Sequence, residues 1–225
     1  MKCAHCGIHF HDNWEEKSMA REGGALEALH DTSRWRWFYR SALCPGTNCG
    51  EVTIEINQRN GQGLRGEWHQ VYPVGANRGP VSSEVPKNIA RDYIEACNVL
   101  PISSKASAAL SRRCLQNVLR DAAYKARDLA SEIDLLLNEP DPKKALPQKL
   151  RETVDAIRNF GNFSAHPIDD KTTLQVIDVE PEEAEWCLEV VEELFDHFYV
   201  GPAAARAKKA ALDVKLAAAG KPLSK

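Results

Sequence analysis

The interpretation of the second half of this chain depends on residues 157–167, whose sequence is IRNFGNFSAHP. They close an amphipathic run that predicts a helix, and Pro167 limits that helix because it disfavours the α conformation at the residue before it. Arg158, Asn162 and His166 are four residues apart, so on a helix they share one face, drifting by about 40° per step. Such a stripe could bind a phosphate and move a proton. In the alternative reading, His166 only caps the helix dipole and Arg158 pairs with a surface carboxylate.

Four more amphipathic runs surround this helix. The predicted helices run from Pro86 to about Leu100, onward from a cap at Ser103 or Ser104, from Asp128 to Asn138, from about Pro147 into the quoted stretch, and onward from Pro181. Cys97, Cys114 and Cys187 fall on apolar faces, so we expect core thiols there. The predicted fold is mainly α, a bundle of about five helices over residues 86–200.

Two cysteine pairs precede the bundle. Cys3 and Cys6 form a C-x2-C-G turn, and Cys44 and Cys49 form a C-x4-C-G turn. Four thiolates on two such turns can close a tetrahedral Zn2+ site, so we expect one structural Zn2+ on these four residues. His5, His9 and His11 are rival ligands that a tetrathiolate site does not need.

The second cysteine turn joins two alternating runs. Trp35, Trp37 and Tyr39 alternate with arginines, and Val52, Ile54 and Ile56 alternate with polar residues. Both runs have the period of two that predicts strands. The outline is a small β module resembling a zinc ribbon over residues 1–60, with residues 12–33 as an inserted loop or short helix.

Alternating arginine and tryptophan could also hold a single-stranded nucleic acid. Glu51 and Glu55 on the partner strand offer a structural alternative, because they could pair across the hairpin with the arginines. The structural alternative is the better supported of the two.

Composition sets the remaining boundaries. Glycine and proline crowd residues 61–85, which predicts a linker, and residues 201–225 form a basic, alanine-rich tail beginning at Gly201-Pro202. A frayed, solvated tail is favoured there over an arm that binds nucleic acid. The net charge of −3 argues against wholesale attraction to nucleic acid or membranes. With no signal peptide and no apolar run near the ~20 residues of a membrane span, we expect a cytoplasmic protein.

Several motifs in the second half occur in a familiar order. They are Tyr72-Pro73, Pro86, residues 92–96 (DYIEA), residues 106–115 (ASAALSRRCL), the quoted stretch, and residues 180–184 (EPEEA). In this order they resemble the bacterial domain-of-unknown-function family numbered 4145, over about residues 68–200. Members often carry a cysteine-pair ribbon in front. The family looks like a relative of the HEPN helical domains, so the resemblance implies a HEPN-like bundle.

Many HEPN domains are metal-independent RNases or RNA-binding modules in toxin–antitoxin and phage-defence systems, and two protomers pair to complete the site. Their motif has an Arg, usually a polar residue next, and a His five positions after the Arg. Asn162 and His166 fit the polar and His positions, but Gly161 stands where the Arg would be. Arg158, or Arg112 or Arg113 from the second helix, could supply that charge.

The resemblance therefore implies an RNA-interacting module, with metal-independent endoribonuclease activity as an option and His166, Asn162 and Arg158 as the catalytic set. The alternative is a non-catalytic interaction or adaptor protein, which Gly161 and the acidic last helix favour. Under these readings the partners are RNA, a second copy of the chain in a homodimer, or another protein, and no membrane.

Overall fold

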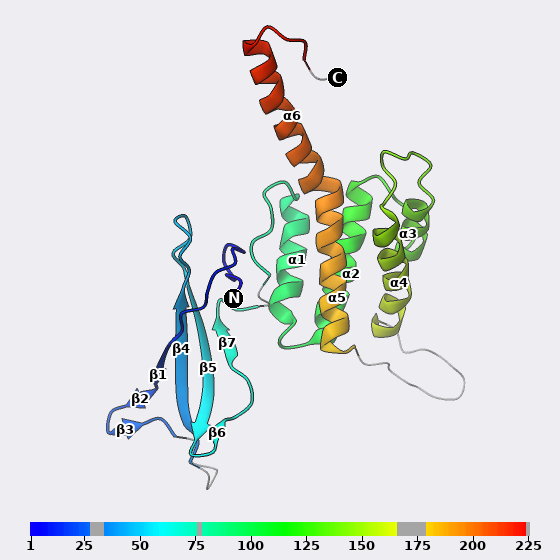
Figure 1. Ribbon diagram of the computed structural model, residues 1–225. Helices are drawn as coiled ribbons and strands as arrows, with labels where there is room; N and C mark the ends of the chain where they lie inside the picture. The colour runs from blue at the N-terminus through cyan, green and yellow to red at the C-terminus, as the bar shows by residue number, and fades with distance from the viewer. Residues whose placement is uncertain (28–33, 76–77, 166–178, 224–225) are drawn as a thin grey trace, which may run out of the picture. The chain divides into compact units, whose positions relative to one another are not determined.

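The computed structural model describes residues 1–27, 34–75, 78–165 and 179–223, and in α4 it describes side chains as far as Ile157. The chain divides into two compact units, Met1–Pro80 and Val81–Lys225 (Figure 1). The first is a sheet and the second is helical, so a helical bundle that follows a small β module is confirmed.

The sheet unit is built around one long hairpin. β4 (Arg36–Leu43) pairs with β5 (Val52–Asn60) in antiparallel register, with Arg40 opposite Glu55. β1 (Glu15–Ser18) pairs with the outer edge of β4, and both β6 (Gly63–Leu64) and β7 (His69–Tyr72) pair with β5. A small separate hairpin joins β2 (Ala20–Arg21) to β3 (Gly24–Ala25). The two strands expected on either side of the second cysteine turn are confirmed.

Two boundary expectations for this unit need correction. Residues 12–33 were expected to form a loop or short helix, but β1, β2 and β3 lie within them. Residues 61–85 were expected to be a linker, but β6 and β7 are part of the sheet, and the compact unit continues to Pro80. In both places a strand of two to four residues is stabilised by its partner strand. So short a strand shows no recognisable alternation of apolar and polar residues in the sequence.

Several of the buried side chains of the sheet unit are polar. Thr53, Asn57 and Gln58 of β5 are buried. Asn57 Nδ2 donates to the carbonyl of Glu67 at 2.8 Å, and Gln58 Oε1 accepts from Arg65 Nη1 at 2.8 Å. These side chains tie β5 to the chain that follows it, but they contribute little apolar burial.

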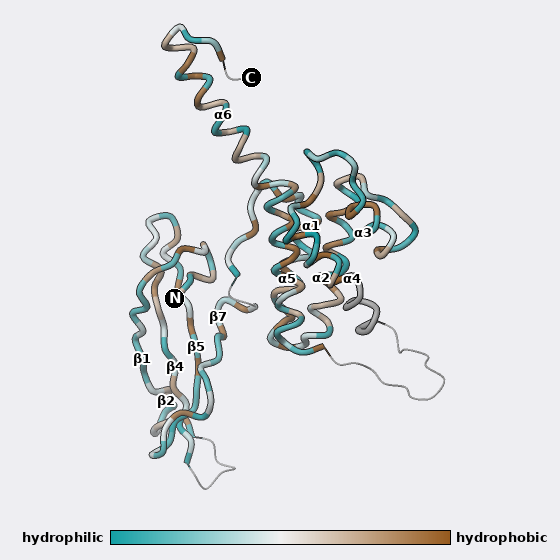
Figure 2. Tube along the Cα trace, turned by 45° about the vertical axis from the view of Figure 1, so that its right-hand side comes forward, coloured by the Kyte–Doolittle hydropathy of each residue, from teal (hydrophilic) through white to brown (hydrophobic). Residues whose placement is uncertain are grey.

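The helical unit has an apolar core. Its bundle consists of α1 (Lys87–Val99), α2 (Ser104–Asp121), α3 (Leu129–Leu137), α4 (Gln148–Ala165) and α5 (Pro181–Phe195). Hydrophobic segments recur along these helices (Figure 2). Side chains in the core include those of Ile89, Leu115, Leu119, Ile133, Leu136, Val154, Leu188, Val191 and Leu194. Cys97, Cys114 and Cys187 are buried among them, which confirms the expectation of core thiols.

The helix starts follow the sequence signals. Ser103 Oγ accepts from the amide of Ala106 at 3.2 Å and so caps α2. Asp128 caps α3 through the amide of Ser131 at 2.9 Å. Pro181 is the first residue of α5, and a capping box joins Glu180 and Glu183. Each cap satisfies amide groups that the first helical turn leaves without partners.

Most of the tail is helical, and it joins the bundle without a break in the helix. Beyond α5 the chain continues through one π-helical turn, η1 (Asp196–Val200), into α6 (Gly201–Ala218). A Cβ atom at Gly201 would lie 2.9 Å from the Asp196 carbonyl oxygen, which accepts the Gly201 amide. In a regular α-helix the Pro202 ring would meet the carbonyl four residues earlier, and the widened turn relieves that clash. Glycine and proline therefore shape this junction without ending the helix.

α6 has no buried residue. Within the described residues, no helix combines the length and the apolar character that crossing a membrane requires.

Candidate functional site

Four cysteines from the two predicted turns meet in the sheet unit. Cys3 and Cys6 lie in an N-terminal turn that the Gly7 amide closes onto the Cys3 carbonyl at 2.9 Å. Cys44 and Cys49 lie in the turn between β4 and β5. All four Sγ atoms lie within 4.8 Å of one another. The prediction that these residues form one cluster is confirmed, and the cluster could hold a metal ion.

The spacing of the sulfur atoms suits tetrahedral coordination. Cys3 Sγ lies 3.9 Å from Cys49 Sγ, and Cys6 Sγ lies 3.6 Å from Cys44 Sγ. Four thiolates bound tetrahedrally at about 2.3 Å from Zn2+ would stand about 3.8 Å apart. The amides of His5 and Gly46 each approach a sulfur, Cys3 Sγ and Cys44 Sγ respectively, at 3.4 Å. Such amide donors favour negative charge on sulfur.

The glycines that follow the pairs also fit this role. Gly7 and Gly50 have φ values of +77° and +63°, in the left-handed region that glycine adopts without strain. Each glycine lets the chain turn back directly after a cysteine. The backbone conformation therefore explains why a glycine follows the last cysteine of each pair.

The rival histidine ligands are not part of the cluster. His5 Nε2 is 2.9 Å from the Val52 carbonyl oxygen, and its ring lies beside Tyr72 with centroids 5.4 Å apart. Among the described residues, the candidate metal cluster in this unit contains the four cysteines and neither His9 nor His11. A site of four cysteines leaves no open position for a substrate, which suits a structural ion.

Without a cation, four adjacent sulfurs cannot all carry charge. Burial raises the pKa of the Cys44 thiol to about 12. Burial also acts to raise the pKa of Cys3, but the amides of Cys6 and His5 outweigh it and lower that pKa to about 7. A bound divalent cation would remove this conflict by stabilising all four thiolates.

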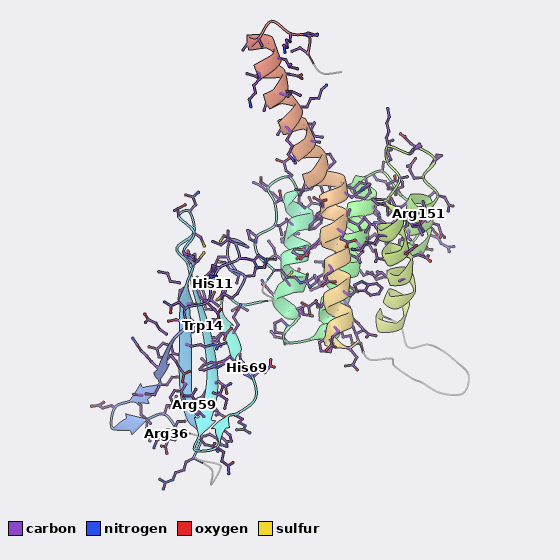
Figure 3. The ribbon with its side chains drawn as sticks, viewed as in Figure 1. His11, Trp14, Arg36, Arg59, His69 and Arg151 are labelled. Atoms are coloured by element: carbon purple, nitrogen blue, oxygen red, sulfur yellow. The ribbon has the colours of Figure 1, made fainter. Side chains whose placement is uncertain are left out.

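The arginine and aromatic residues of the sheet form a second cluster. Arg40 lies between the rings of Trp14 and Trp68, at 4.3 and 4.6 Å from their centroids, and its Nη2 is 2.6 Å from Glu55 Oε2. Arg59 pairs with Glu16 at 2.9 Å and lies over Phe38. Figure 3 labels Trp14, Arg36 and Arg59 on this unit. The expected pairing of an arginine with Glu55 is confirmed, whereas the part played by Trp14 and Trp68 was missed because both lie outside β4 and β5.

The structure describes only part of the proposed catalytic stripe. Arg158 and Asn162 lie in α4, in the part whose side chains are not described, and α4 is described to Ala165. His166 lies outside the described residues. Backbone geometry alone places Arg158 and Asn162 about one helical turn apart on one face of α4.

The two arginines of α2 differ in their surroundings. Arg113 Nη2 is 2.8 Å from Asp92 Oδ1 and 3.1 Å from Glu95 Oε2. Asp92 is buried and also accepts from Asn117 Nδ2 at 2.8 Å, so Arg113 is committed to this network between α1 and α2. Arg112 is half-buried, and burial lowers its pKa against the opposing effect of Asp128.

The comparisons with known proteins found one family. The profile described as Domain of unknown function (DUF4145) matches residues 94–215, which is more than half of the chain. The match runs from α1 into α6 and contains the stretch 157–167, but not the cysteine cluster. No curated protein and no solved structure matches the chain.

Proposed function

Because the chain belongs to the DUF4145 family, we propose that its helical unit is a HEPN-like module that interacts with RNA and carries a metal-independent endoribonuclease site. We further propose that the sheet unit is a zinc ribbon whose Zn2+ has a structural role. The proposed setting is a defence or toxin-type system, with a homodimer as the working form.

The observation that carries the RNase proposal is the extent of α4. This helix is unbroken from Gln148 to Ala165, so Arg158 and Asn162 share one face and His166 follows its last described residue. In the proposed scheme His166 takes the proton from a ribose 2′-OH or donates one to the leaving oxygen. Arg158 stabilises charge on the phosphate, and Asn162 orients one of the reacting groups.

Gly161 occupies the position of the usual HEPN arginine, so the charge must come from another residue. The ion pairs of Arg113 with Asp92 and Glu95 make it a poor source. Arg158 is our first choice, and Arg112 is the second.

Cleavage of single-stranded RNA in the presence of a chelator tests this proposal. We expect activity that persists without metal, is lost in His166→Ala, and falls in Arg158→Ala. The matched control is His69→Ala, which removes an exposed histidine from the sheet unit and should leave the rate unchanged (Figure 3). Full activity in His166→Ala would remove this residue from the scheme.

A second candidate is a non-catalytic adaptor that binds another protein. It is favoured by the ion pairs of the sheet, where Arg36, Arg40 and Arg59 each meet a glutamate. Arginines neutralised in this way contribute little attraction for RNA. An adaptor would show no turnover on RNA or DNA, and His166→Ala would change neither the melting temperature nor the oligomeric state measured by light scattering.

A further inference from the structure

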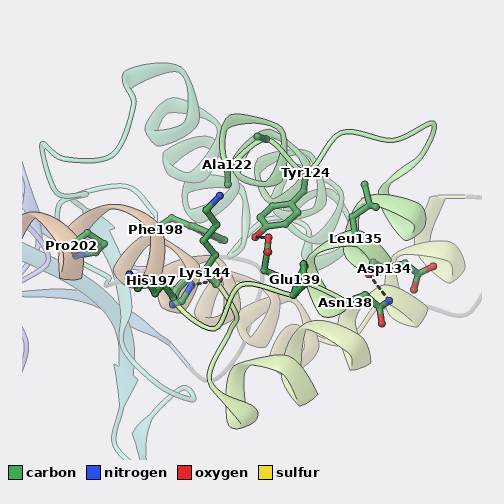
Figure 4. Close-up of a pocket in the computed structure, with 13 residues that line it drawn as sticks. Ala122, Tyr124, Asp134, Leu135, Asn138, Glu139, Lys144, His197, Phe198 and Pro202 are labelled. Atoms are coloured by element: carbon green, nitrogen blue, oxygen red, sulfur yellow. Dashed lines mark hydrogen bonds between the residues drawn. The ribbon is translucent and has the colours of Figure 1, made fainter.

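A cavity of about 770 Å³ opens in the helical unit where α5 passes into α6 (Figure 4). Its volume is within the roughly 300–1,000 Å³ that small-molecule sites occupy. Three segments line it: residues 122–124 directly after α2, residues 134–144 from α3 and the loop after it, and the junction at 197–202. None of the residues discussed above as catalytic belongs to it.

Two departures from regular helix shape this cavity. The π-helical turn η1 contributes His197 and Phe198 to its wall. Directly after α2, Ala123 has a φ of +72°, and the Tyr124 amide donates to the Leu119 carbonyl at 2.8 Å. π-Helical turns inside helices are frequent at functional sites because they redirect side chains that a regular helix would place elsewhere.

One wall of the cavity is aromatic and apolar. The Phe198 ring lies 4.7 Å from the His197 ring and 6.3 Å from the Tyr124 ring, measured between centroids. Leu135 is 48% exposed although it is a large aliphatic residue. A planar ring placed here would cover apolar surface and meet ring faces or edges.

A fixed carboxylate stands within the same cavity. Glu139 Oε2 accepts from Tyr124 Oη at 2.7 Å, and Glu139 Oε1 accepts from the Asp141 amide at 2.9 Å. The Asp141 amide, followed by the Tyr124 hydroxyl, lowers the pKa of Glu139. The carboxylate is therefore charged and held in place, and its remaining lone pairs can accept from N–H groups of a ligand.

Two adjacent cations lie beside the carboxylate. Lys143 and Lys144 are exposed, and the charge of Lys144 helps to lower the pKa of Glu139. His197 Nε2 lies 3.3 Å from the Lys144 carbonyl oxygen and links this loop to the π-helical turn. Two ammonium groups free to turn toward one point suit a phosphate.

The geometry points to a binding site for one nucleotide, with its base against Phe198 and Tyr124, its amino edge at Glu139 and its phosphate at Lys143 and Lys144. The same chemistry is offered by a free nucleotide and by one residue of a single strand. The site is separate from the proposed RNase stripe and does not depend on it.

Isothermal titration of the full chain tests this site. The ligands are GMP, AMP, CMP and UMP, with guanosine, ribose 5-phosphate and a single-stranded RNA tetranucleotide as comparisons. The double variant Lys143→Glu/Lys144→Glu removes the cations, and Lys125→Glu is the matched control because it changes an exposed lysine of the α2–α3 connection that does not line the cavity. Circular dichroism verifies that each variant is folded.

We expect a nucleoside monophosphate to bind more tightly than its nucleoside or ribose 5-phosphate. The double variant should weaken nucleotide binding by about tenfold or more, because it removes two charge-assisted hydrogen-bond donors and places negative charge at the phosphate. Lys125→Glu should bind as the parent chain does. Binding of the tetranucleotide alone, weakened by the double variant, would assign the site to a strand.

Three results would overturn the inference. They are no binding of any nucleotide or tetranucleotide at millimolar concentration, equal loss in the double variant and in Lys125→Glu, and binding of ribose 5-phosphate as tight as that of every nucleotide. The last would mean an anion site without base recognition. Catalytic activity is not a readout here, so failure of this site leaves the RNase proposal standing.

Discussion

The two units of this chain differ in what stabilises the fold of each. Every large side chain that is almost fully buried belongs, among the described residues, to the helical unit. In the sheet unit the buried residues classed as hydrophobic are Cys3, Ala42 and Cys44, beside the polar Thr53, Asn57 and Gln58. One unit thus has an aliphatic core, whereas the other has a cluster of four cysteines. A small domain without a core needs a cross-link or a metal to stay folded.

The comparison teaches where stability and function can be separated. The helical unit should keep its fold when an exposed residue such as Leu212 is changed. If the four cysteines hold Zn2+ as proposed, the sheet unit should depend on the occupancy of that cluster. Tryptophan fluorescence and helical circular dichroism can follow the two units separately, because four of the five tryptophans (Trp14, Trp35, Trp37 and Trp68) lie in the sheet unit.

The largest effect should come from Cys44→Ser. Structural Zn2+ contributes an apparent binding free energy of about 10–16 kcal/mol in small zinc modules, which exceeds any stability the sheet could have alone. We expect zinc content well below one equivalent per chain and a red-shifted tryptophan emission, with helical circular dichroism unchanged. The control is Cys187→Ser, a buried thiol of the helical core. A folded, metal-free sheet in Cys44→Ser would break the comparison.

Leu188→Ala should be next and should act on the other unit. Leu188 is fully buried in α5, and truncating a buried leucine costs about 2–5 kcal/mol. The melting transition followed by circular dichroism should fall, while zinc content and tryptophan emission at low temperature stay unchanged. Leu212→Ala on α6, where Leu212 is 49% exposed, should be nearly neutral. Loss of zinc in Leu188→Ala would show that the units are coupled.

Asp92→Ala should have a smaller effect on the same unit. The carboxylate is buried and accepts from Arg113 and Asn117, so its loss leaves both donors without their partner. Because Arg113 is half exposed and can regain water, we expect a cost of about 2 kcal/mol, measured by denaturant unfolding. Glu95→Ala, which removes the exposed acid of the same network, should cost less than about 1 kcal/mol. Equal costs would contradict the part assigned to burial.

The smallest effect should come from Glu55→Gln in the sheet. Arg40 would lose its ion pair but keep its place between Trp14 and Trp68, so we expect a cost of about 1 kcal/mol. Fluorescence-detected unfolding of the zinc-loaded chain measures it. Complete unfolding of the sheet by this change would mean that the arginine cluster, and not the cysteine cluster, holds the unit.

The sequence was informative where the physical cause is local. The C-x2-C and C-x4-C spacings, the caps at Ser103 and Asp128, and the helical periods of α1 to α5 all depend on residues close together in the chain. It failed where the cause is distant. β1 and β7 need their partners β4 and β5, and the cavity needs residues 197–202 to lie beside residues 122–144.

The continuous helix through Gly201-Pro202 could not be predicted for a different reason. Both residues usually end helices, and nothing in the local pattern predicts the π-helical turn that accommodates them. The catalytic stripe stays a prediction, since Arg158 and Asn162 are placed by backbone only and His166 is outside the described residues.

Amide hydrogen exchange of the full chain, with and without a zinc chelator, tests the central claim most directly. The account predicts that the amides of β4 and β5 lose their protection when the metal is removed, while those of α2 and α5 keep theirs. Sheet amides that remain protected in metal-free protein, or helical amides that lose protection together with the sheet, would contradict it.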